Sequence, residues 1–161
     1  MIQIFLVGLC LLPLTTWAAD EPADSAARNW PQWRGPLGTG VAPYGNPPTT
    51  WSETENIRWK VTIPGQGHAS PIVWGDRVFV LTAIQTDQTL PPQEESEEGK
   101  PAWLDPKMPG YVYKFDILAL DRQSGAVVWQ RTARTEPPHE GTHQDGSWAP
   151  ASPVTDDEIG R

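Results

Sequence analysis

The stretch 139–143 matches a pattern that is typical of zinc proteases. His139-Glu140-Gly141-Thr142-His143 spells H-E-x-x-H, which binds zinc when a helix places both histidines on one face and the glutamate acts as general base. Here Pro137-Pro138 precede the stretch and Gly141 lies inside it. Because proline and glycine both disfavour a helix, we expect no zinc-protease site and no metal site here.

His139, His143 and Asp145 still lie close together in the sequence, on an expected connection between two sheet units. Exposed connections often carry binding residues. These three side chains are therefore candidates for a ligand or ion site, and the alternative is a solvated loop with no ligand. The sequence contains neither a glycine-rich phosphate loop nor a G-x-S-x-G nucleophile motif, so we assign no catalytic residue, and whether the protein is an enzyme stays open.

The composition favours strands and turns as the elements that position these residues. The chain has 161 residues with 14 Gly and 18 Pro, which interrupt or weaken helices. It also has 9 Trp, so flat aromatic packing matters. With 12 basic and 20 acidic residues, the net charge is −8. This charge excludes the basic footprint of a nucleic-acid-binding protein and argues against an anionic membrane surface as partner.

Residues 1–18 are typical of a secretory signal peptide. An apolar run spans Ile2 to Leu14, and Thr16-Trp17-Ala18 places small residues at −3 and −1 for cleavage after Ala18. A membrane anchor is the alternative, but the run is shorter than the ~20 residues that a membrane span needs. We predict a secreted or periplasmic protein whose mature chain has no integral membrane span. Cys10 lies within the leader, so the mature chain would contain no disulfide.

Short apolar runs separated by turn residues predict one antiparallel sheet within residues 71–83 and 112–131. Gly75-Asp76 is a two-residue hairpin turn, and Asp121 and Gly125 favour a second turn because Asp bonds nearby backbone and Gly takes positive φ. The four predicted strands are 70–74, 77–82, 114–120 and 126–130. The period-2 alternation of residues 57–63 predicts a further strand, from an adjoining unit.

Two other segments lack such patterns. Residues 19–50 are predicted to be flexible and irregular, with Trp30 and Trp33 packed against the body of the domain. Residues 85–110 carry six acidic residues against two lysines, which predicts an exposed insertion. A carboxylate metal site is the alternative there, but the segment lacks the ligand spacing of a calcium loop.

The pattern then restarts within the segment 51–161. Ala69-Ser70-Pro71-Ile72-Val73 returns as Ala151-Ser152-Pro153-Val154-Thr155, and Ile57-Arg58-Trp59-Lys60 returns more loosely as Val127-Val128-Trp129-Gln130. A four-stranded unit that restarts indicates a β-propeller.

The residues at this point resemble those of a known family. Ala119-Leu120-Asp121-Arg122-Gln123-Ser124-Gly125-Ala126-Val127-Val128-Trp129 looks like the A-x-D-x-x-[ST]-G-x-x-x-W signature of pyrroloquinoline-quinone-like (PQQ-like) propeller repeats. Ala119, Asp121, Gly125 and Trp129 carry this signature. Trp30-Pro31-Gln32-Trp33-Arg34-Gly35-Pro36 is similar to the start of secreted PQQ-like repeat proteins of the planctomycete type. The resemblance covers about residues 30–161, apart from the acidic insertion.

The resemblance implies an all-β propeller of four-stranded antiparallel blades. We expect an N-terminal fragment with about one full blade and parts of its neighbours, since rings typically have 4–8 blades. Trp129 would bridge to the next blade and Trp59 would do so for the preceding unit. The function implied is a binding or assembly scaffold for a protein partner or small ligand on a propeller face. The alternative is a PQQ- and calcium-dependent dehydrogenase of alcohols or sugars, with PQQ implied by the resemblance only.

Overall fold

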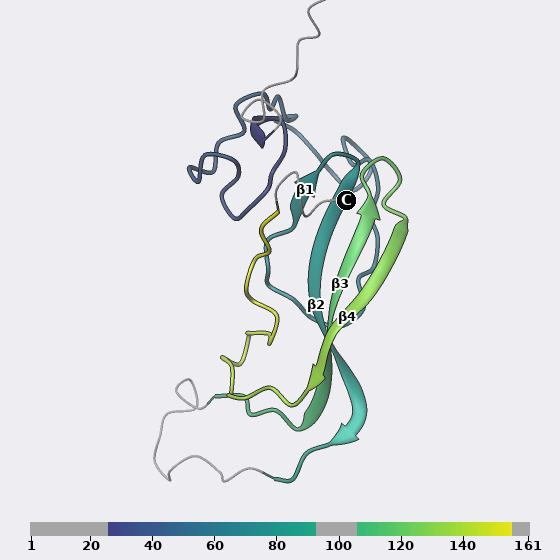
Figure 1. Cartoon of the computed structure of the whole chain (residues 1–161). Coiled ribbons are helices and arrows are strands. Elements are labelled where there is room, and N and C mark those ends of the chain that lie inside the picture. The colour runs from purple at the N-terminus through teal and green to yellow at the C-terminus, as the bar shows by residue number, and fades with distance from the viewer. Residues whose placement is uncertain (1–25, 93–105, 156–161) are drawn as a thin grey trace, which may run out of the picture.

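The computed structural model describes residues 26–92 and 106–155, so the predicted signal peptide and half of the acidic insertion lie outside the described residues. The named elements are four strands: β1 (Ile72–Trp74), β2 (Arg77–Thr89), β3 (Tyr111–Asp121) and β4 (Val127–Glu136). They form one antiparallel sheet in the order β1-β2-β3-β4 (Figure 1). The predicted all-β class and four-stranded antiparallel sheet are confirmed, and the sheet is open, with β1 and β4 at its edges.

The strands are longer than the apolar pattern predicts. We expected the second strand to end at Thr82, but β2 continues to Thr89, into the first residues of the predicted insertion. These residues have backbone partners on β3, and the Thr86 hydroxyl donates to the Val112 carbonyl at 2.8 Å. Polar residues at a solvated strand end carry no apolar alternation, although the backbone pairing continues there. β4 likewise extends to Glu136.

The core lies along β3, between its two neighbours. Leu118, Ala119 and Leu120 are fully buried or nearly so, and Ile72 and Thr82 join them from β1 and β2. By contrast, residues 127–135 of β4 are exposed along their whole length. Burial therefore falls steeply from the centre of the sheet to the β4 edge.

The predicted strand at 57–63 is wrong, because these residues form no regular element. Alternating side chains suit a strand, but a strand also needs a neighbouring backbone to pair with. The segment instead reaches the sheet through the Trp59 side chain and through the Pro64 carbonyl, which accepts from the Thr82 hydroxyl at 2.6 Å. Only an isolated bridge between Gln66 and Ala83 follows.

The segment 26–50 is irregular and is tied to the body at Trp30. The expected packing of Trp33 against the body is wrong, because Trp33 is 62% exposed. The Trp30 N–H donates to the Val73 carbonyl at 2.9 Å, and the Val73 N–H donates back at 2.8 Å. The Thr155 N–H also donates to the Pro31 carbonyl at 2.9 Å. Residues from both ends of the described chain therefore meet beside β1, as Figure 1 shows.

Candidate functional site

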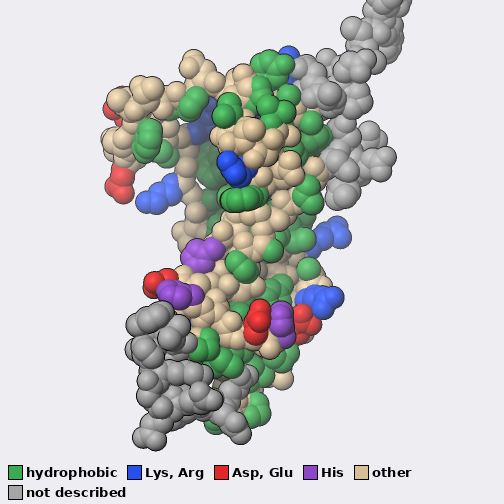
Figure 2. All heavy atoms as spheres, turned by 90° about the vertical axis from the view of Figure 1, so that its left-hand side faces the viewer, with side chains coloured by type: hydrophobic (Ala, Val, Ile, Leu, Met, Phe, Trp, Pro, Cys, Tyr) green, Lys and Arg blue, Asp and Glu red, His purple; other side chains and the backbone are tan. Residues whose placement is uncertain are grey.

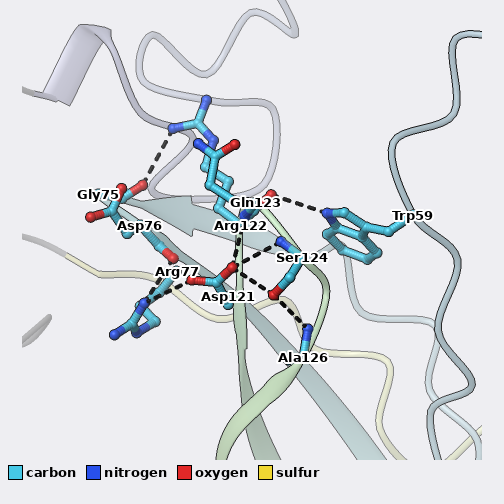
Figure 3. Close-up of polar contacts among 9 residues, drawn as sticks. All are labelled: Trp59, Gly75, Asp76, Arg77, Asp121, Arg122, Gln123, Ser124 and Ala126. Carbon is cyan, nitrogen blue, oxygen red and sulfur yellow. Dashed lines mark hydrogen bonds and ion pairs between the residues drawn. The ribbon is translucent and has the colours of Figure 1, made fainter.

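The β3–β4 turn is held by one carboxylate. Asp121 Oδ1 accepts from the Ser124 hydroxyl at 2.7 Å, from the Ser124 N–H at 2.8 Å and from the Gln123 N–H at 3.1 Å (Figure 3). These bonds favour the ionised form and hold the pKa of Asp121 below its usual value, with the Ser124 bonds as the largest cause. Gly125 completes the turn at φ +74°, which suits glycine.

Trp59 docks on this turn from a segment distant in sequence. Its indole Nε1–H donates to the Arg122 carbonyl at 3.0 Å (Figure 3). Its ring lies so close to Gly125 that a Cβ there would be 2.6 Å from the ring carbons. The neighbouring Arg58 guanidinium donates to the Gln123 side-chain oxygen. The turn thus offers a carbonyl and a flat, Cβ-free surface that together fit one indole.

The four signature residues all lie in the β3–β4 hairpin. Ala119 on β3 is paired with Trp129 on β4, and Asp121 and Gly125 form the turn between these strands. The Trp129 ring contacts Phe79 on β2, with centroids 6.0 Å apart, and Arg131 lies 5.9 Å from its centroid. Trp129 is 36% exposed, so the structure places the signature around a turn and leaves one indole at the surface.

The connection 137–150 runs back along the sheet and is fastened at three places. Lys107 and Thr142 exchange two backbone hydrogen bonds of 2.7 and 3.0 Å. The Ala149 carbonyl accepts from the His68 and Ala69 N–H groups, and the Ser147 hydroxyl also accepts from the His68 N–H at 3.1 Å. The connection is therefore a fixed part of the fold, well placed to line cavities.

The candidate residues of this connection do not form one site. His143 Nδ1 accepts from the Asp145 N–H at 3.2 Å, with Asp145 Oδ2 at 3.9 Å. His139 Nε2 lies 3.7 Å from Glu140 Oε1, and its side chain is 90% exposed. The H-E-x-x-H stretch is irregular and non-helical, as expected. Across residues 26–92 and 106–155, no three His, Cys, Asp or Glu residues are grouped to hold a metal ion.

His139 and Asp145 line two different cavities. One, of about 430 Å³, is mostly polar and includes His68, Lys107 and Asp145 in its lining. The other, of about 380 Å³, includes His139 and Glu140. Figure 2 shows histidines and acidic side chains near one another on one face of the molecule.

Sequence reasoning missed the residue that forms the wall of the second cavity, Trp148. The Trp148 ring contacts Tyr113 with centroids 4.6 Å apart, and Lys107 Nζ lies 5.4 Å from its centroid. Its indole N–H donates to the Glu140 carbonyl at 3.2 Å. Burial in this cluster is the main cause that raises the pKa of Tyr113. Trp148 has no repeat or periodic pattern around it, so only the fold reveals its role.

Comparison of the chain with protein-family models, curated proteins and solved structures gives no match. In the described part of the chain, no helix has the length and apolar character needed to cross a membrane.

Proposed function

We propose that this chain belongs to a secreted or periplasmic PQQ-like β-propeller protein that acts as a binding or assembly scaffold. The observation that carries the proposal is the docking of Trp59 on the turn at Gly125 and Arg122. In that contact, a tryptophan from one segment closes on the turn of a four-stranded sheet that begins after it. This is the kind of joint that a series of repeated sheets needs.

The repeat in sequence extends this joint beyond one contact. Residues 127–130 repeat the pattern of 57–60, which places Trp129 at the position that Trp59 holds. Trp129 lies on the exposed edge strand, with part of its ring uncovered. In the proposed ring, this indole docks on the corresponding turn of a following blade, which would cover exposed apolar side chains near it, Val127 among them.

A scaffold function accounts for the roles of the residues that the fold fixes most firmly. Asp121 is used by the turn, and Trp59 is used by the docking contact. The connection 137–150 presents cavities and polar side chains on one face, where a protein partner or small ligand would bind. No residue is assigned to a catalytic step in this proposal.

A cofactor titration separates the scaffold from the dehydrogenase alternative. We expect the exported natural protein to show neither a thermal shift with PQQ and Ca²⁺ nor PQQ-dependent reduction of an artificial electron acceptor with alcohols or sugars. Saturable PQQ binding with turnover would contradict the scaffold function and support the dehydrogenase.

N-terminal sequencing of the exported protein tests the proposed location. We expect Ala19 as the first residue, and a soluble cytoplasmic pool that retains Met1 would contradict the proposed export.

A further inference from the structure

The cavity beside Trp148 combines an aromatic wall with a polar rim. Phe115 on β3 and Trp148 on the connection supply aromatic surface, and Pro138 and Pro150 add apolar surface. The end of β4 and the connection supply the rim: Arg134, Glu136, His139 and Glu140. The volume of about 380 Å³ lies within the range of about 300–1,000 Å³ that is typical of small-molecule sites.

The Trp148 ring is held in place before any ligand arrives. Its N–H is bound to the Glu140 carbonyl, and its ring packs against Tyr113 and beneath the Lys107 ammonium group. A ring fixed on several sides loses little conformational entropy when a ligand stacks on it. The aromatic wall therefore favours a ligand with a flat apolar face.

The rim places hydrogen-bond donors and carboxylate acceptors next to one another. Arg134 Nη1 lies 3.4 Å from Glu136 Oε1, and His139 Nε2 lies 3.7 Å from Glu140 Oε1. Arg134 thus has a carboxylate next to it, and His139 lies beside a second carboxylate with which it forms an ion pair only when its imidazole is protonated. A charged ligand group of either sign would meet a like charge in this rim, so the rim favours a neutral ligand. It does offer N–H donors and carboxylate acceptors side by side, which suits a ligand that carries several hydroxyl groups.

From this combination we infer that the cavity between β4 and the connection 137–150 binds a neutral sugar ring. The apolar C–H face of a pyranose packs on Trp148, and its hydroxyls bond to Arg134, Glu136 and His139. This inference goes beyond the scaffold function and does not depend on it, because the named lining side chains all belong to one sheet and its connection. Binding, not oxidation, of the sugar is proposed.

The test is a titration of the ¹⁵N-labelled mature chain with methyl β-glucoside, followed through the indole N–H signals. The Trp148 signal is assigned as the one that is missing in Trp148→Phe. We expect saturable shifts of that signal with a Kd in the millimolar range. Glucuronate and glucosamine should bind no more tightly than the neutral glycoside. No shift of the Trp148 signal with methyl β-glucoside would overturn the inference, and tighter binding of either charged sugar would do so as well.

Rim variants keep the test independent of folding, because Trp148 also packs in the core cluster with Tyr113. Arg134→Ala and His139→Ala change exposed side chains and should each weaken binding about threefold to tenfold, the range expected for one lost hydrogen bond. Trp33→Ala, at an exposed tryptophan of the segment 26–50, is the matched control and should leave Kd unchanged. Unchanged affinity in both rim variants would contradict the inference.

Discussion

Trp59 and Trp129 occupy matching positions in two related stretches of sequence, 57–60 and 127–130, but their surroundings differ. Trp59 has its N–H bonded to a backbone carbonyl and its ring pressed on Gly125. Trp129 contacts Phe79 and Arg131 through its ring and remains 36% exposed. The two tryptophans are chemically the same, so the difference lies in what each one meets.

Trp59 packs against the β3–β4 turn, whose shape is fixed by residues of the turn itself. Asp121 fixes the backbone from 121 to 124, and Gly125 removes the Cβ that would block the ring. Trp129 has no such turn against it in the described residues. The comparison shows that the docking contact depends on the turn as much as on the tryptophan, and four predictions test this.

Gly125→Ala should give the largest loss. Alanine at φ +74° costs roughly 1–2 kcal/mol, and its Cβ would also collide with the Trp59 ring, so we expect a total near 3 kcal/mol in the free energy of unfolding measured in urea. Gly75→Ala is the control, since Gly75 also has positive φ, at +54°, but nothing near its missing Cβ. Equal losses in the two variants would show that the ring contact contributes nothing.

Trp59→Ala should lower the free energy of unfolding by about 2 kcal/mol. This is less than the roughly 3–5 kcal/mol lost on removal of a fully buried tryptophan, because Trp59 is half-buried. Trp129→Ala should cost about 1 kcal/mol or less, since its main described contact is Phe79. Chemical denaturation of both variants measures the two losses in the free energy of unfolding.

The double variant Trp59→Ala/Gly125→Ala should lose less free energy of unfolding than the sum of the two single variants, because the two residues contact each other. Additive losses would mean that the two residues do not interact.

Gln130→Ala should give a larger loss than a change next to Trp59, because Gln130, the neighbour of Trp129 in the sequence, donates a part-buried hydrogen bond to a buried carboxylate. Gln130 Nε2 donates to Asp116 Oδ2 at 2.5 Å, and Asp116 is 4% exposed with Oδ1 unpartnered in the described structure. Removing the donor should cost about 1–2 kcal/mol. Gln123→Ala, which removes the exposed bond next to Trp59, should cost less than about 0.5 kcal/mol. A larger loss at Gln123 would mean that burial does not decide the strength of these bonds.

Acid should weaken the turn through Asp121, with the smallest effect of the four. Its pKa is lowered in the folded state, so its stabilisation is complete above the unfolded pKa near 3.8 and is lost as the pH falls through the folded pKa. The difference in Tm between the parent chain and Asp121→Asn should be constant above about pH 5 and shrink below about pH 4. Ser124→Ala removes the hydroxyl donor and should reduce this pH dependence. A Tm difference between the parent chain and Asp121→Asn that is the same at about pH 3 and pH 7 would contradict this role of Asp121.

The sequence predicted the sheet well where local signals coincide. Apolar runs with Gly75 and Gly125 at the turns identified all four strands, because turn residues and alternation act over a few positions. Residues 57–63 showed the same alternation but form no strand, since pairing depends on a neighbour that alternation does not report. The ends of β2 and β4 were missed for the opposite reason, as polar residues pair there without an apolar pattern.

The candidate site was less predictable than the sheet. The sequence put His139, His143 and Asp145 close together, but the connection bends so that His139 lines one cavity and Asp145 lines another. The wall of the second cavity, Trp148, meets Tyr113 and Phe115 of β3 only because residues 137–150 return along the sheet. Such a meeting depends on the path of the chain, which short-range patterns do not encode.

The hydrogen bonds between segments that are distant in the sequence also imply an order of folding. The two hairpins close short loops, whereas the Trp59–Arg122 bond closes a separation of 63 residues and the Ser70–Ser152 bond one of 82. Longer loops cost more entropy to close, by about 0.6 kcal/mol per doubling of length, so the hairpins form early and these closures form late. Late contacts govern mainly the unfolding rate. The contact of Trp59 with the β3–β4 turn therefore slows the unfolding of the sheet once the sheet has formed.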